Sequence, residues 1–339
     1  MFRTRQFPVF LFAIVLMANA FSNRCVGQES IDMRPTFTPD SVRYIELVQQ
    51  VEDKWEASSL GPARTQKREW TRGVLQSIDP PWSQGNYIAP LTFERVAFRG
   101  TIQSGEQVVY DSDLDERSAA RNPARNISRI MIGQPFVLLI TEEGRGSGVT
   151  GLRALYKKIE EQEAANPLLE MVMGSFSEDT ARYTWGHFPY SLYAFASVKV
   201  GDTWGVPLRA YDIFLGETQY DMKCRLDGIT SKNGRKIAKI SFTATLSTPP
   251  DARKGMHLGI TRLELQSGKL EGTAEYDIEQ HEFINHHAKT VMNIYATISG
   301  DSDTSDEMFG LQRTMNETRT VVSQERRAAQ RQARKNSSK

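Results

Sequence analysis

Apolar side chains follow a helical spacing near the start of the chain. Between residues 41 and 58 they fall three or four positions apart, at Val42, Ile45, Val48, Val51 and Trp55. This spacing places them on one face of a helix. Thr38 and Pro39 stand just before it and supply a start signal, since threonine caps free backbone amides and proline fits the first helical position. The pattern therefore predicts an N-terminal helical segment over residues 28–66.

From about Lys67 onward, apolar and polar positions alternate, which is typical of strands with one buried face. The alternation is clearest at Ala238, Ile240, Phe242, Ala244 and Leu246. Turn-forming pairs interrupt the strands and predict tight hairpins at Ser104-Gly105, Asn233-Gly234, Ser267-Gly268 and Gln280-His281. We expect an antiparallel sheet that a last strand over residues 311–323 closes.

Helical patterns interrupt the strands once, over residues 150–164 and 166–176, and the second begins with an Asn-Pro start signal. Residues 113–126 are polar without periodicity and predict a surface loop. The expected fold class is α+β, with mostly antiparallel curved sheet, an N-terminal helix and a central helical pair. Residues 67–324 would form the β-rich domain, either whole or as two sub-domains, 67–185 and 186–324.

The first 27 residues have the layout of a signal peptide. Arg3 and Arg5 precede an apolar run from residue 9 to residue 17, which is too short to span a bilayer, and cleavage fits after Ala20 or Gly27. The mature protein is therefore expected in the periplasm or outside the cell, without a transmembrane anchor. The cut also decides whether Cys25 stays with the chain and could pair with Cys224.

Composition narrows the possible partners. Lys and Arg number 42 against 41 Asp and Glu, so the formal net charge is +1, and the mean hydropathy is −0.46. This balance does not indicate a nucleic-acid partner. The tail, residues 325–339, is basic and is expected to be disordered or to form a frayed helix. It carries Arg326, Arg327, Arg331, Arg334, Lys335 and Lys339 against Glu325. A solvated tail is the main interpretation, and contact with an anionic surface is the alternative.

Residues 146–151 spell G-x-G-x-x-G, the form of a dinucleotide-binding turn. Five residues, two of them carboxylates, separate this motif from the preceding apolar run, and no second strand follows the helix as a dinucleotide fold requires. We therefore predict a hairpin instead, with Gly144 in the turn, residues 146–149 paired with the strand before them, and Thr150 capping the next helix. No cofactor is expected.

Candidate catalytic and metal-binding residues are few. His286 and His287 are adjacent on a predicted strand and must face opposite sides, while His281 falls in a turn. A zinc site needs three or four convergent ligands, so the histidines are interpreted as isolated and exposed: His187, His257, His281, His286 and His287. Cys224 is expected to be buried in a strand. We assign no catalytic, cofactor-binding or metal-binding residues.

Four segments carry a family resemblance: "QPFVLLITEEGRGSGVTGLRAL", "FPYSLYAFASVKVGDTW", "LEGTAEYDIEQHEFINHHAKTV" and "TMNETRTVV". The chain resembles a family of uncharacterised secreted bacterial proteins over about residues 90–325, most specifically in the V-K-V-G-D-x-W element from Val198 to Trp204. The resemblance implies an exported β-rich domain without assigned activity. Its plan is similar to the curved sheets of periplasmic lipoprotein carriers.

Three functional hypotheses follow. The main one is an exported, non-enzymatic carrier or binding module for an apolar small molecule or an envelope partner. The alternatives are a hydrolase of a cell-envelope polymer and a structural or scaffold protein that uses an exposed strand edge.

Overall fold

The computed structural model describes residues 30–58, 61–79, 87–101, 106–117, 122–141, 145–163, 166, 178–194, 196–212, 215–250, 262–298 and 307–337. The predicted signal peptide and Cys25 lie outside these residues, and so does His257. The same holds for Ser104, Gly105, Gly144 and residues 167–176, so the predictions that concern them stay predictions.

One large antiparallel sheet organises the described chain. Its strands run in the order β7-β6-β4-β3-β2-β14-β13-β12-β11-β10-β9, and β5 pairs with β4 at the side. The strands are β2 Val42–Trp55, β3 Arg64–Ser77, β4 Tyr87–Thr101, β5 Gln107–Asp111, β6 Pro135–Ile140, β7 Gly146–Thr150, β9 Thr203–Asp212, β10 Gly216–Lys232, β11 Arg235–Ser247, β12 Arg262–Asp277, β13 Glu282–Ile298 and β14 Glu307–Val322. Two short strands, β1 Ser30–Asp32 and β8 Ser197–Lys199, form a separate pair. The prediction of an α+β fold with a mostly antiparallel curved sheet is confirmed.

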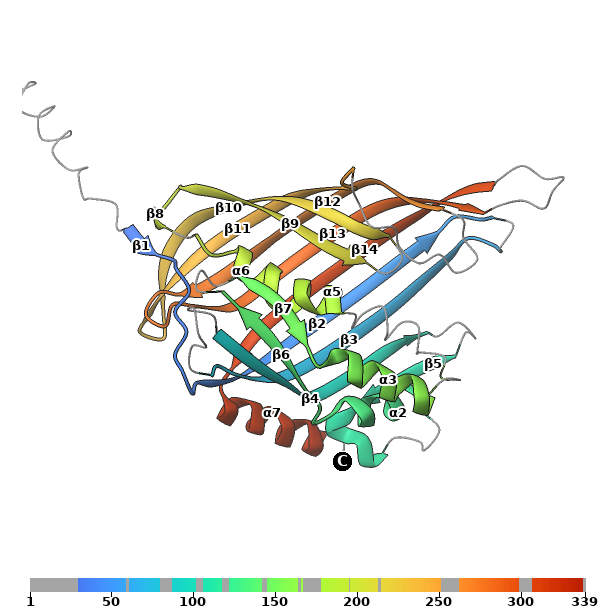
Figure 1. The fold of residues 1–339 in the computed structure, drawn as a ribbon, viewed down its shortest axis with the longest axis horizontal. Helices are drawn as coiled ribbons and strands as arrows, with labels where there is room; N and C mark the ends of the chain where they lie inside the picture. The colour runs from blue at the N-terminus through green and yellow to red at the C-terminus, as the bar shows by residue number, and fades with distance from the viewer. Residues whose placement is uncertain are drawn as a thin grey trace, which may run out of the picture.

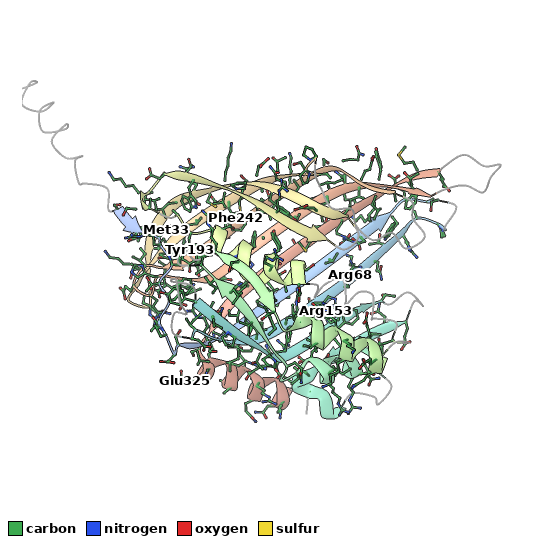
Figure 2. The ribbon with its side chains drawn as sticks, viewed as in Figure 1. Met33, Arg68, Arg153, Tyr193, Phe242 and Glu325 are labelled. Carbon is green, nitrogen blue, oxygen red and sulfur yellow. The ribbon has the colours of Figure 1, made fainter. Side chains whose placement is uncertain are left out.

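Short helices lie on both faces of this open, curved sheet (Figure 1). They are the 3₁₀ helix η1 Ser112–Arg117, α2 Pro123–Met131, α3 Leu152–Glu163, α5 Glu178–Ala181, the π-helical turn η2 Arg182–His187, α6 Phe188–Ser191 and α7 Gln324–Ser337. The run α5-η2-α6 contacts both β7 and β9, the two edges of the sheet. Figure 2 shows Tyr193 and Phe242 within the curve of the sheet, whereas Glu325 marks α7 outside it.

The predicted N-terminal helix is wrong, because residues 42–55 form β2 in the middle of the sheet. The apparent helical spacing combines the two faces of β2: Val42 and Val48 lie on its outer face, and its inner face also carries the polar side chains Gln49 and Asp53. These side chains are paired across the sheet: Gln49 donates to Glu317, and Asp53 accepts from Arg313. Both partners lie on β14, more than 250 residues away, so the local sequence hides the period of two.

Two of the predicted hairpin turns are confirmed and one is wrong. Asn233-Gly234 joins β10 to β11 with positive φ at both residues, and Gln280-His281 joins β12 to β13. Gly268, in contrast, lies inside β12. A Cβ there would come within 2.6 Å of the Leu246 Cβ on β11, so this glycine permits a close strand approach.

The last predicted strand exists as β14 but does not close the sheet. It lies between β2 and β13 and thereby joins the N-terminal strands to the C-terminal ones. The surface loop predicted over residues 113–126 is wrong where the structure describes it, because η1 and α2 form its two ends. Asn122 caps α2 by accepting from the amides of Ala124 and Arg125, with Pro123 at the first helical position. The helix expected over residues 150–164 is confirmed as α3.

The strand pairing predicted for the glycine-rich stretch is confirmed, whereas Thr150 is the last residue of β7 and is separated from α3 by Gly151. Gly146 pairs with Ile140, and Val149 pairs with Leu138 in an antiparallel register. Gly186 of η2 packs on this strand, since a Cβ at Gly186 would lie 3.2 Å from the Gly146 Cα and 2.9 Å from the Leu138 side chain. The glycines therefore serve backbone packing at the sheet edge.

The C-terminal tail is helical and not disordered, so of the two expected states the helix is the one observed. Residues 324–337 form α7 on the outer face of the sheet, held by the buried carboxylate of Asp113. Arg327 donates to Asp113 at 2.7 and 2.8 Å and lies over the Tyr44 ring, and Arg334 donates to Asp113 at 2.9 Å. Charge pairing, with no apolar stripe, therefore fixes the helix. The tail has no core-forming side chains for a sequence pattern to reveal.

Candidate functional site

A chain of buried polar side chains crosses the inner face of the sheet. Arg72 on β3 donates to Gln49 on β2, whose amide donates at 2.6 Å to Glu317 on β14, and Glu317 faces His286 on β13 at 3.3 Å. Burial lowers the pKa of Arg72 to about 10, so its guanidinium stays charged at neutral pH. Each member is hydrogen-bonded to the next, and these bonds offset the cost of burying the polar groups.

His286 is neutral in this network. Burial lowers its pKa more strongly than Glu317 raises it. Burial works to raise the pKa of Glu317, but the bonds from His286 and Gln49 and the charge of Arg72 hold that pKa below its ordinary value. We therefore place the proton of His286 on Nε2, where it is donated to an ionised Glu317. The ring of Phe188 from α6 meets the imidazole edge to face at 5.2 Å and covers one side of it.

We expect the free energy of unfolding to decrease between about pH 7.5 and pH 5.5. An imidazole whose folded pKa is lowered has no effect while both states are neutral. Below its unfolded pKa of about 6.5, the unfolded chain takes the proton first and stability is lost. Denaturant unfolding at several pH values measures this slope. His286→Gln should flatten it, whereas His287→Gln on the exposed face should retain it. A His286→Gln protein with the full wild-type slope would contradict this assignment.

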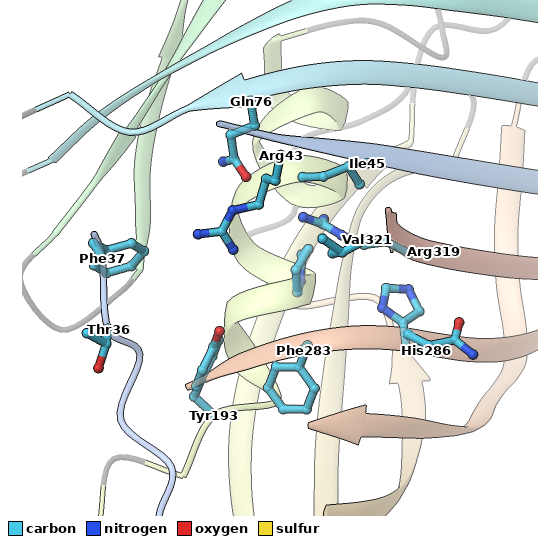
Figure 3. A pocket seen from close by; sticks show the side chains of 12 residues that line it. Thr36, Phe37, Arg43, Ile45, Gln76, Tyr193, Phe283, His286, Arg319 and Val321 are labelled. Carbon is cyan, nitrogen blue, oxygen red and sulfur yellow. The ribbon is translucent and has the colours of Figure 1, made fainter. Parts of the chain in front are cut away.

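A small pocket opens beside the network, near the ends of β2, β3, β13 and β14. Its walls include Arg43, Gln76, Tyr193, Phe283, His286 and Arg319. Figure 3 shows Gln76 and Arg43 on one side of it and Tyr193 and Phe283 on the other. The volume is about 30 Å³, which accommodates roughly two water molecules.

Gln76 places a buried amide donor at this pocket. Its side chain is only 2% exposed, and its Nε2 is buried without a hydrogen-bond partner. A buried donor of this kind costs roughly 1–3 kcal/mol unless something accepts from it. Arg43, by comparison, is paired with Glu282, and Arg319 lies over the Trp185 ring at 5.8 Å.

A second, larger hollow shares Tyr193 with the pocket. This groove has a volume of about 630 Å³. It is lined by Tyr193, Ala194, Ala196, Val198, Gly201, Asp202, Thr203, Trp204, Gly205 and Val206, so most of the V-K-V-G-D-x-W element belongs to it. Asp202 stabilises the turn with two hydrogen bonds. Its carboxylate accepts from the Lys199 amide at 2.8 Å, and its carbonyl oxygen accepts from the Leu226 amide at 3.1 Å. The element therefore forms a tight turn that carries Trp204 into the groove wall.

The structure separates the residues singled out from the sequence. His286 and His287 face opposite sides as predicted and His281 lies in a turn, but His286 is buried and paired where an isolated, exposed histidine was expected. His187 lies in η2. Cys224 is buried in β10 as predicted, and burial raises the pKa of its thiol to about 12, which keeps it unreactive at neutral pH. In the described part of the chain, no three His, Cys, Asp or Glu side chains gather around one metal position.

Arg43, Gln76 and Arg319 are pocket residues that no pattern in the sequence indicates. Each stands in a segment interpreted as helix or as an ordinary strand, and they come together only through the pairing of β2 with β3 and β14. Of the described helices, none is both long and apolar enough to span a membrane.

Comparison with solved structures gives only remote likenesses. A structure of lipovitellin with its lipid–protein interactions aligns at a TM-score of 0.39 and 8% identity, over 85% of this chain and 26% of that one, so this chain spans about a quarter of it. The outer membrane protein OprG from Pseudomonas aeruginosa aligns at 0.22 and 8%, over 84% and 98%. A DUF1329 family protein from Desulfovibrio piger aligns at 0.12 and 8%, over 83% and 86%. These scores are too low to support an argument about function.

No curated protein matches the sequence. A family model does match it, across the glycine-rich hairpin, the V-K-V-G-D-x-W element and β12, which confirms the resemblance to an uncharacterised family. The chain belongs to this family of unknown function, DUF6263, whose model matches residues 84–280, more than half of the sequence.

Proposed function

We propose that the protein is an exported, non-enzymatic binding module that holds a small, largely apolar molecule in the groove beside β8 and β9. The observation that carries this proposal is the groove itself. Its volume of about 630 Å³ falls in the range of roughly 300–1,000 Å³ that small-molecule sites occupy. Its lining residues are mainly small or apolar, and Trp204 is the largest of them.

The polar groups of the groove favour binding over hydrolysis. Among the described residues that line it, the carboxylate is Asp202, which is already bonded to the Lys199 amide. A glycosidase would need two carboxyl groups facing each other across the substrate. The indole Nε1 of Trp204 is buried and lacks a hydrogen-bond partner. An apolar site with a few polar groups is the arrangement expected of a binding protein.

A filled groove tests this proposal. Ala196 is exposed and lines the groove, so Ala196→Trp should occupy the site while the protein still folds. We expect it to weaken binding of the neutral fluorescent probe N-phenyl-1-naphthylamine by about tenfold or more, equivalent to about 1.4 kcal/mol. Ala154→Trp, at an exposed position of α3, is the matched control. If the wild-type protein binds no probe, or if both variants bind it equally well, the groove is not the site.

A further inference from the structure

We propose that the pocket beside Tyr193 binds a carboxylate group. This inference rests on the binding function proposed above and names the polar end of the ligand. The hydrocarbon part of the ligand would lie in the groove, and its carboxylate would be received by Gln76, Arg43 and Arg319. Tyr193 lines both hollows, so they lie next to each other at this side chain.

The pocket is rich in hydrogen-bond donors. The Gln76 Nε2 is buried, lines the pocket and lacks an acceptor. Two guanidinium groups, from Arg43 and Arg319, line the same small space. A guanidinium carries five N–H donors, so the bond from Arg43 to Glu282 through Nη1 leaves that side chain able to donate to a ligand as well. An oxygen-rich anion is the complement of such a site.

The size of the pocket and the rings that line it also fit a carboxylate. A volume of about 30 Å³ matches the space of roughly two waters, and the two oxygens of a carboxylate occupy a similar space. Guanidinium groups bind carboxylates with two parallel hydrogen bonds. The rings of Phe37, Tyr193 and Phe283 stand at the same pocket, and their apolar surface strengthens hydrogen bonds to charge by keeping water away.

A carboxylate could come from a free small acid or from the head of an amphiphile. Three probes separate these sources by calorimetry: dodecanoate carries head and body, dodecan-1-ol carries the body alone, and acetate carries the head alone. The test variant is Gln76→Leu. Because the Gln76 amide nitrogen has no partner, leucine should fold as well as glutamine or better. Gln312→Leu, at an exposed position of β14, is the matched control.

The expected result is that dodecanoate binds wild-type protein more tightly than dodecan-1-ol does. Gln76→Leu should raise the dissociation constant of dodecanoate by about tenfold, which is the effect of losing one hydrogen bond to a charged group. It should leave dodecan-1-ol binding unchanged without lowering the unfolding midpoint, and Gln312→Leu should behave as wild type.

The outcomes also separate this inference from the function it rests on. Equal binding of dodecanoate and dodecan-1-ol, unaffected by Gln76→Leu, would overturn the carboxylate site and leave the apolar groove standing. Acetate binding that depends on Gln76, without any dodecan-1-ol binding, would support the carboxylate site for a free acid and overturn the groove. If none of the three probes binds, both proposals fail.

Discussion

Asp113→Asn is expected to lower the free energy of unfolding by about 3–5 kcal/mol, the range found when one partner of a buried ion pair loses its charge. Asp113 is 5% exposed and accepts from Arg327 and Arg334. Arg95 lies within 3.5 Å of the same carboxylate. Burial works to raise the pKa of Asp113, but these arginines hold it below its ordinary value. Asparagine would leave the 6% exposed Arg327 charged and uncompensated in the interior.

Denaturant unfolding of the full chain measures this loss, and Arg331→Gln supplies the control. Arg331 approaches the same carboxylate at 3.6 Å, but its side chain is 59% exposed, so solvent screens the pair and the change should stay within about 1 kcal/mol. Similar unfolding midpoints for the two variants would show that α7 does not depend on Asp113.

Gly272→Ala is expected to cost about 3 kcal/mol or more, at the upper end of overpacking effects. A Cβ at Gly272 would lie 2.2 Å from the backbone oxygen of His287 and 2.3 Å from the Phe242 ring. Both neighbours belong to strands paired with β12, so the steric clash can be removed only if the backbone of the sheet moves. The variant should lose soluble yield and unfold at lower denaturant concentration.

Gly228→Ala is the control, because a Cβ at Gly228, beside a bulge of β10, meets nothing within 4 Å. Circular dichroism melting of the two variants side by side makes the comparison. Equal melting temperatures would contradict the tight packing of β11, β12 and β13 around Gly272.

The β-rich character and the antiparallel hairpins could be predicted from the sequence, because alternation and turn-forming pairs are patterns of residues close together in the chain. Residues 238–246 alternate in the sequence, and the same residues alternate in β11. The strand at residues 42–55 was not recognised, because its inner face carries the polar side chains Gln49 and Asp53. These side chains can face inward because Glu317 and Arg313 from β14 pair with them. A strand whose inner face is polar cannot be recognised until its distant partner is known.

The candidate site was less predictable than the sheet. The V-K-V-G-D-x-W element stood out by family resemblance, but its place in a groove wall follows from the β9–β10 pairing. Gln76 gave no signal of its own, because its importance comes from burial without a partner. The helical structure of α7 could not be predicted for a related reason. Arg327 is stabilised in the interior by Asp113, which lies more than 200 residues earlier in the chain.

The central claim is that the groove and the pocket form one ligand site, and titration of the ¹⁵N-labelled protein with dodecanoate tests it most directly. The account predicts that the indole N–H signal of Trp204 and the side-chain amide signals of Gln76 shift together and saturate at one ligand per chain. The indole signal of Trp70, which lines neither hollow, should stay in place. A Trp204 signal that does not move, or a Gln76 signal that moves only with ligand far in excess, would contradict the account.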